Sequence, residues 1–167
     1  MINLKIDLDQ KDLQRFLNAA PRTIFNAQRS ALRTTTTFAD KLLKDRMALA
    51  TGLPGKVFKN FRVFKRSTDY QGIIFLGLNP VKAAYAGKLT QESGGASAGQ
   101  YYWAGGFVAK MRTGHLSIFK RKGAQRFPLV EQVVELPQAQ VIAEQVADEA
   151  AAELQRRYLE KLEASLR

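Results

Sequence analysis

The chain has 167 residues, of which 46% are hydrophobic and 25% are charged, as in ordinary globular domains. It contains no cysteine and one histidine, which excludes disulfides, thiolate metal sites, cysteine nucleophiles and histidine clusters. The net charge of +11 is concentrated in residues 51–128, with thirteen basic and two acidic residues. Residues 129–167 hold four basic and eight acidic residues. A basic centre beside an acidic end predicts a polyanionic partner for the centre and another role for the end.

The N-terminal third predicts a strand followed by helices. Apolar and polar residues alternate over residues 2–8, the pattern of a half-buried strand. From Leu13 to Leu49, apolar residues then recur at intervals of three, four or seven, which predicts one apolar helical stripe. Pro21 fits the first turn of a second helix that ends near Gly52, and the threonine run 34–37 predicts a weak point within it.

The middle of the chain changes to the periodicity of strands. A short helical turn is expected after Pro54, and the small, polar, glycine-rich residues 88–100 predict a flexible loop. A two-residue hairpin turn is expected at Thr113-Gly114. The strands are predicted at residues 61–66, 72–78, 105–112, 115–122 and 127–134.

The C-terminal segment predicts one long helix over residues 138–166. Its apolar residues recur every four positions from Ile142 to Leu166, and alanine, glutamate and glutamine dominate the rest. We therefore expect the α+β class, with one small antiparallel sheet packed against a long N-terminal helical segment and a long C-terminal helix. No composition shift marks a domain boundary, so residues 1–167 are expected to form a single domain.

The sequence offers little support for catalysis. His115 falls in a predicted hairpin, where a structural or exposed role is expected. Asp69 and Glu92, the only carboxylates of the basic centre, fall in predicted loops, and the glycines of residues 94–99 do not match a phosphate-binding pattern. We expect no catalytic residue, no metal site and no cofactor.

Basic residues alternate with aromatic ones along the predicted strands. The aromatic residues (Phe58, Phe61, Phe64, Phe119 and Phe127) are expected to pack inward, which leaves a basic outer face. No motif for sequence-specific readout is present, so this face predicts non-specific, phosphate-directed contact with nucleic acid. The candidate DNA-contacting residues are Arg62, Lys65, Arg66, Lys120, Arg121, Lys122 and Arg126.

Residues 106–115 (GFVAKMRTGH), followed by 118–123 (IFKRKG) and 127–129 (FPL), resemble the phage minor tail protein Z family. Members carry a similar strand and hairpin, G-F-I-A-x-M-x-S/T-G-H, then V-F-x-R-K-G and L-P-I. Residues 88–104 are longer and richer in glycine than the usual connection. The hairpin motif comprises Gly106, Met111, Arg112, Thr113, Gly114 and His115.

The resemblance implies a virion structural protein that acts late in tail assembly, near the head-proximal end of the tail. It further implies a homo-oligomeric ring, such as a hexamer, with other tail and head–tail connector proteins as partners and genomic DNA passing through. The protein would be made in the cytoplasm of the host bacterium and end in the virion tail, with no membrane partner. A free, sequence-non-specific nucleic-acid-binding protein is the alternative, and an enzyme is a distant third.

Overall fold

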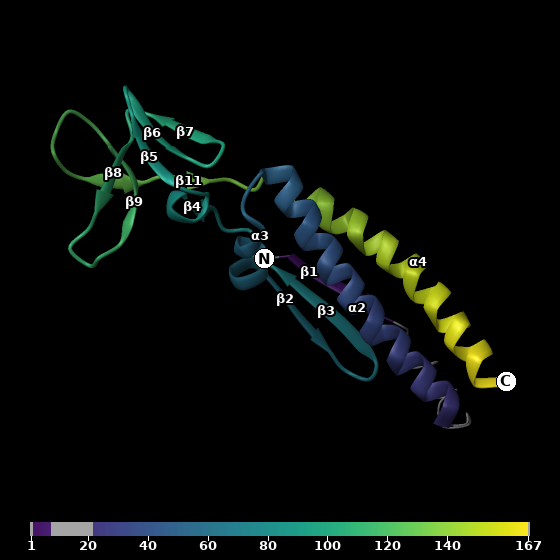
Figure 1. The fold of residues 1–167 in the computed structure, drawn as a ribbon. Coiled ribbons are helices and arrows are strands. Elements are labelled where there is room, and N and C mark those ends of the chain that lie inside the picture. Colours follow the sequence, from purple (N-terminus) through teal and green to yellow (C-terminus); the bar gives the residue numbers. More distant parts are fainter. Residues whose placement is uncertain (1, 8–21, 167) are drawn as a thin grey trace.

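The computed structural model describes residues 2–7 and 22–166, which form two lobes that lie end to end (Figure 1). The helical lobe contains two long helices and a three-stranded sheet, and the C-terminus lies at its far end. Its elements are β1 (Ile2–Asp7), α2 (Arg22–Thr51), β2 (Val63–Ser67), β3 (Gln71–Leu76) and α4 (Ala139–Leu166). The remaining strands form the β lobe. The predicted helix before Pro21 lies outside the described residues.

Helix α2 runs without interruption through the threonine run. The hydroxyls of Thr34, Thr36 and Thr37 each donate to a backbone carbonyl four residues earlier, at 2.9, 2.7 and 3.0 Å. These bonds keep the hydroxyls paired within the helix. The predicted weak point therefore does not break the helix, which ends at Thr51 as expected, with Gly52 at φ +60°.

Helices α2 and α4 pack side by side in antiparallel orientation. Arg46 on α2 forms an ion pair with Glu149 at 2.7 Å, whereas the earlier Phe38 lies under the guanidinium of the later Arg157. The buried residues of α4 repeat every three or four positions, as its sequence predicted. They are Ala139, Ile142, Ala143, Val146, Ala150 and Leu154.

The sheet of the helical lobe has the strand order β1-β3-β2 and is antiparallel throughout. Val63 on β2 and the alternate β3 residues Gly72, Ile74 and Leu76 are buried on the face toward the helices. Helix α2 approaches this face closely, because a Cβ atom added to Gly72 would lie 2.0 Å from the hydroxyl oxygen of Thr36. Glycine is therefore required at this crossing of helix and strand.

The β lobe contains three further small antiparallel sheets. Their strand orders are β5-β6-β7, β10-β9-β8 and β11-β4. The α+β class is confirmed, but the single expected sheet is replaced by several short ones. The strands are β4 (Val81–Lys82), β5 (Leu89–Glu92), β6 (Gly95–Ala98), β7 (Tyr101–Ala104), β8 (Phe107–Lys110), β9 (Leu116–Arg121), β10 (Leu129–Glu131) and β11 (Val133–Val134).

The prediction of a loop over residues 88–100 is wrong. This segment forms β5 and β6, and Ala96 and Ala98 are fully buried. Its glycines serve close packing: a Cβ atom on Gly87 would lie 2.6 Å from the backbone nitrogen of Gly99, and one on Gly95 would lie 2.5 Å from a strand carbonyl. The high glycine content of this segment resembles that of a linker. Here glycine is required because the backbones of neighbouring strands are in contact.

The inward packing predicted for the aromatic residues holds only in part. Phe58 and Phe119 are buried, but Phe64 is 55% exposed and Phe127 is 63% exposed. Phe64 follows the buried Val63 on β2 and so lies on the opposite face of the sheet. Phe127 belongs to the exposed connection between β9 and β10.

Several predicted boundaries also change. The turn after Pro54 continues from α3 (Gly55–Val57) into a π-helical turn, η1 (Phe58–Arg62), so the strand predicted from residue 61 starts at Val63. The strand predicted over 127–134 is divided between β10 and β11. A short 3-10 helix, η2 (Ala83–Tyr85), follows β4.

The C-terminal end of α2 anchors the β lobe. The backbone carbonyl of Thr51 accepts hydrogen bonds from the side-chain amide of Gln100, at 2.8 Å, and from the hydroxyl of Tyr101. The last carbonyls of a helix have no partner within the helix, so these two donors satisfy an exposed acceptor. The β lobe therefore supplies hydrogen-bond donors to the C-terminal end of α2.

Replacing Gly72 with alanine should destabilise the protein. The new methyl group would meet the Thr36 hydroxyl, and overpacking of this kind costs about 1–3 kcal/mol in the free energy of unfolding. Urea denaturation followed by circular dichroism measures the change. Gly123→Ala is the matched control, because no atom lies within 4 Å of its added Cβ. Equal midpoints for the two variants would show that the helix and sheet do not approach as described.

Candidate nucleic-acid interface

The β8–β9 hairpin holds the sequence motif at residues 106–115. The backbone N–H of Met111 donates to the carbonyl of His115, and that of Gly114 donates to the carbonyl of Met111, both at 2.8 Å. These bonds define a three-residue loop, Arg112 to Gly114, in place of the predicted two-residue turn. Gly114 has φ +84°, the left-handed conformation that such a loop needs at its last position. Arg112 and Thr113 are exposed at its tip.

Gly106 has a packing role at the start of the motif. A Cβ atom there would lie 2.9 Å from the carbonyl oxygen of Trp103 and 3.1 Å from a side-chain carbon of Ile118. The chain can therefore turn from β7 into β8 only where the side chain is absent.

His115 is tied into an ion-pair cluster that the sequence did not predict. Its Nε2 lies 2.6 Å from one carboxylate oxygen of Glu131, and the ammonium of Lys82 lies 3.0 Å from the other oxygen. Burial raises the pKa of Glu131, but the hydrogen bonds to His115 and Lys82 lower it more, so the pKa falls below its ordinary value of 4.5. The cluster links β4, the turn that precedes β9, and β10. This link supports the structural role expected for His115.

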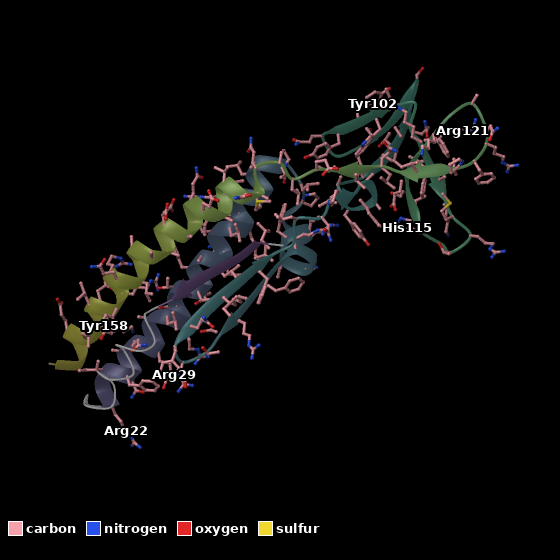
Figure 2. The ribbon with its side chains drawn as sticks, turned by 180° about the vertical axis from the view of Figure 1, so that it is seen from behind. Arg22, Arg29, Tyr102, His115, Arg121 and Tyr158 are labelled. Carbon is pink, nitrogen blue, oxygen red and sulfur yellow. The ribbon has the colours of Figure 1, made fainter. Side chains whose placement is uncertain are left out.

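Four of the predicted basic residues lie at the end of β9 and in the exposed connection that follows it, and Figure 2 labels Arg121 at the far end of the β lobe. Among the described residues, none of them forms an ion pair with a carboxylate. The guanidinium of Arg121 lies 5.8 Å from the ring centre of Phe107, and that of Arg126 lies 5.6 Å from the ring centre of Phe127. We call these four residues the distal basic tip: Lys120, Arg121, Lys122 and Arg126.

The other three predicted residues lie on the helical lobe, apart from the distal basic tip. Arg62 donates to the carbonyl of Pro80 at 2.9 Å, and its Nε is buried. Lys65 points toward α2, with its ammonium 3.2 Å from the hydroxyl of Thr37 and 3.9 Å from Asp40. Arg66 is exposed on the far face of β2. A single basic face formed by both groups is therefore not present, because they belong to different sheets.

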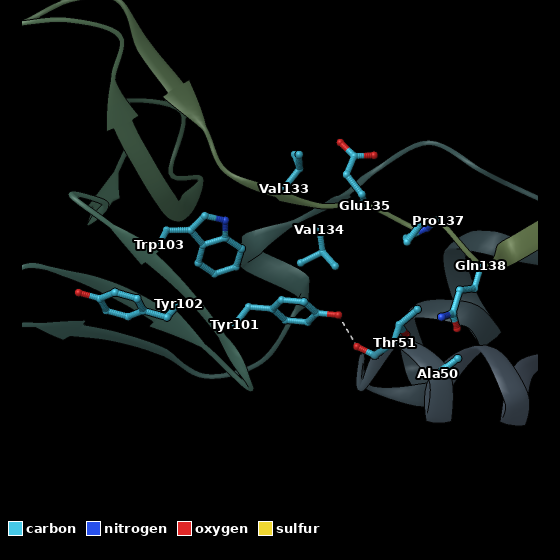
Figure 3. Close-up of a pocket in the computed structure, with 10 residues that line it drawn as sticks. All are labelled: Ala50, Thr51, Tyr101, Tyr102, Trp103, Val133, Val134, Glu135, Pro137 and Gln138. Atoms are coloured by element: carbon cyan, nitrogen blue, oxygen red, sulfur yellow. Dashed lines mark hydrogen bonds between the residues drawn. The ribbon is translucent and has the colours of Figure 1, made fainter.

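A groove of about 370 Å³ lies where the two lobes meet (Figure 3). The Tyr101 hydroxyl bonded to Thr51 crosses one end of it, and the rings of Tyr101 and Trp103 stack with centres 6.0 Å apart. Its walls are mainly apolar. The lining residues are Ala50, Thr51, Tyr101, Tyr102, Trp103, Val133, Val134, Glu135, Pro137 and Gln138.

Within residues 2–7 and 22–166, histidine, aspartate and glutamate side chains do not gather in groups of three that could hold a metal ion. Over the same residues, neither long helix has an apolar stretch of the length that a bilayer requires.

Comparison with known proteins places the chain in a class of phage structural proteins, those of the tail. The profile of the family described as "Prophage minor tail protein Z (GPZ)" matches residues 10–167, nearly the whole chain. The chain therefore belongs to the prophage minor tail protein Z family, as its hairpin motif indicated. No curated protein and no solved structure matches it.

The Glu131 cluster predicts a specific dependence of stability on pH. Because the folded-state pKa is lowered, the cluster contributes stability that is fully present above pH 4.5 and is lost as the pH falls through the folded-state pKa. Chemical denaturation should therefore show wild type more stable than Glu131→Gln at pH 6, with the difference shrinking below pH 4.5. Glu163→Gln, an exposed carboxylate on α4, is the control. A difference that does not change with pH would contradict this account.

Proposed function

We propose that the chain is a tail-completion subunit that forms a homo-oligomeric ring around the DNA channel, near the junction of tail and head. A hexamer is one such ring, and other tail and connector proteins would contact it. The distal basic tip faces the DNA in this arrangement. The observation that carries the proposal is the exposure of four cationic side chains at one end of the molecule without a carboxylate partner among the described residues.

The distribution of carboxylates supports a polyanion as the partner of the tip. The basic centre has two acidic residues, and both are engaged elsewhere: Asp69 pairs with Arg29 at 2.7 Å, and Glu92 accepts a hydrogen bond from Ser97. The tip thus keeps a positive field that mobile counterions must screen. DNA phosphates would release those counterions, which gives affinity without sequence preference.

The two groups of basic residues differ in exposure and in their contacts within the fold. The distal basic tip (Lys120, Arg121, Lys122 and Arg126) lies on an exposed strand end and loop, where a duplex could approach it. Arg62 and Lys65 form hydrogen bonds within the fold, to Pro80 and Thr37. We therefore assign the DNA-facing role to the tip and leave Arg62 and Lys65 a structural role.

We also propose that the protein is not an enzyme. Glu131 is a half-buried carboxylate of the β lobe. One of its oxygens is bound by His115 and the other by Lys82. A carboxylate in that position, with a lowered pKa, is a poor general base at neutral pH. Its two ion pairs connect β10 to β4 and to the turn before β9, which accounts for its position in the structure.

Removing the tip charges should weaken DNA binding and its dependence on salt. Wild type should bind duplex DNA weakly and without sequence preference, and Lys120/Arg121/Lys122→Gln should reduce the slope of log K against log [salt] by up to about 3. Fluorescence anisotropy at several salt concentrations measures this slope. Arg33/Lys41/Lys161→Gln removes the same charge from exposed helical positions and should leave the slope nearly unchanged.

The same tip variant, introduced into a phage that encodes this protein, should assemble tails but lower infectivity. Tight or sequence-specific binding by wild type would favour the alternative of a free nucleic-acid-binding protein. Unchanged binding together with unchanged infectivity would contradict the DNA-facing role.

A further inference from the structure

Among the described residues, Phe127 is the phenylalanine with the largest exposed fraction, 63%. It lies between β9 and β10, in a stretch where every residue from Lys120 to Pro128 is exposed. A single exposed apolar side chain is ordinary on a protein surface. The surroundings of this ring are not ordinary, because the same stretch carries all the cations of the distal basic tip and contains no carboxylate.

Strand pairing brings the ring of Phe127 to the end of the β9–β10 hairpin. The backbone N–H of Lys122 donates to the carbonyl of Pro128 at 3.3 Å, so the two chains stay paired beyond the last residues of the strands. The residue across the loop from Phe127 is Gly123, which has no side chain that could cover the ring. A Cβ atom added to Gly123 would meet no atom within 4 Å, so the end of the loop is open.

One guanidinium lies against this ring. The guanidinium of Arg126 is 5.6 Å from the ring centre of Phe127, within the range of cation–π attraction. Among the described residues, neither an aromatic ring nor a second cation lies against Phe127. A ring has two faces, and the exposed fraction of 63% shows that much of this one remains open to solvent.

An open aromatic ring among unpaired cations has the chemistry of a surface that binds single-stranded nucleic acid. The cations attract phosphates, and any base can stack on the ring, because every base has a π face. Duplex DNA offers the same phosphates to the cations but keeps its bases paired and stacked inside. Contact with a duplex backbone would therefore use the cations and leave the ring of Phe127 without a role.

We infer that the distal basic tip binds unpaired DNA, with a base stacked on the open face of Phe127 and the adjacent phosphates on the tip cations. The inference rests on the proposed DNA-facing role and narrows the ligand from a phosphate backbone to a backbone with an unpaired base. Any single strand offers such a base, and so does an unpaired end of a duplex. Stacking does not read the identity of the base, so binding stays without sequence preference.

A second exposed phenylalanine provides a matched control. Phe64 on β2 is 55% exposed and is followed by two cations, Lys65 and Arg66. The ammonium of Lys65 lies 3.9 Å from the carboxylate of Asp40, so part of this positive charge is neutralised within the fold. Phe64 therefore has a comparable exposed fraction but lies outside the distal basic tip.

Four variants separate stacking from the other properties of the ring. Phe127→Ala removes the ring, Phe127→Leu keeps an apolar side chain without a π face, and Phe127→Tyr keeps an aromatic ring. Phe64→Ala removes the control ring. Each variant changes an exposed side chain, so melting temperatures close to wild type are expected.

Fluorescence anisotropy with the full chain tests the inference on three labelled probes of equal length. They are a single strand of thymines, the same strand without bases, and a duplex. Wild type, Phe127→Tyr and Phe64→Ala should bind the thymine strand about tenfold more tightly than the abasic strand. Phe127→Ala and Phe127→Leu should bind the two single strands alike. The Phe127 variants should keep the slope of log K against log [salt], because their phosphate contacts are unchanged.

Equal affinity of wild type for the two single strands, with the salt slope intact, would overturn the stacking and leave the DNA-facing role in place. A preference for bases that persists in Phe127→Ala would overturn the assignment to this ring. Absence of salt-dependent binding to all three probes would overturn the DNA-facing role and the stacking together. Unchanged DNA binding by Phe127→Ala with loss of tail assembly would make the ring a contact with another protein, and so would also overturn the inference.

Discussion

Helix α2 is buried on two sides at once, and the rest of the structure depends on this constraint. Leu43 and Met47 are fully buried in the core that α2 shares with α4 and the sheet, and the hydroxyl of Thr36 leaves room only for Gly72 at the sheet. The same helix ends at the carbonyl of Thr51, which Gln100 and Tyr101 bind. Through these contacts α2 positions α4, the three-stranded sheet and the β lobe together.

The end-to-end arrangement of the two lobes separates two kinds of charged surface. The distal basic tip lies at one end, and the carboxylates of α4 lie along the helical lobe (Figure 2). Three carboxylates of α4, those of Glu149, Glu153 and Glu160, pair with arginines of the same lobe, so the helical lobe neutralises part of its own charge. The cations of the distal basic tip form no such ion pair with the described residues, so they are left for a partner outside the chain.

The helices and strands with strong periodicity could be predicted from the sequence, since burial on one side dictates which positions are apolar. Helices α2 and α4, the strand pair β2 and β3, and the β8–β9 hairpin follow from such patterns. Residues 88–100 could not, because the glycines that pack β5 and β6 have the composition of a linker. The basic candidates were found, but their division between sheets and the pairing of His115 with Glu131 depend on contacts that are distant in sequence.

Electron cryo-microscopy of the tail of a phage that encodes this chain tests the central claim, that the protein is a structural subunit around the DNA channel. We expect a closed ring of copies near the head-proximal end, with Lys120, Arg121 and Lys122 toward the lumen. A tail in which the chain is absent, or in which these residues face outward, would contradict it.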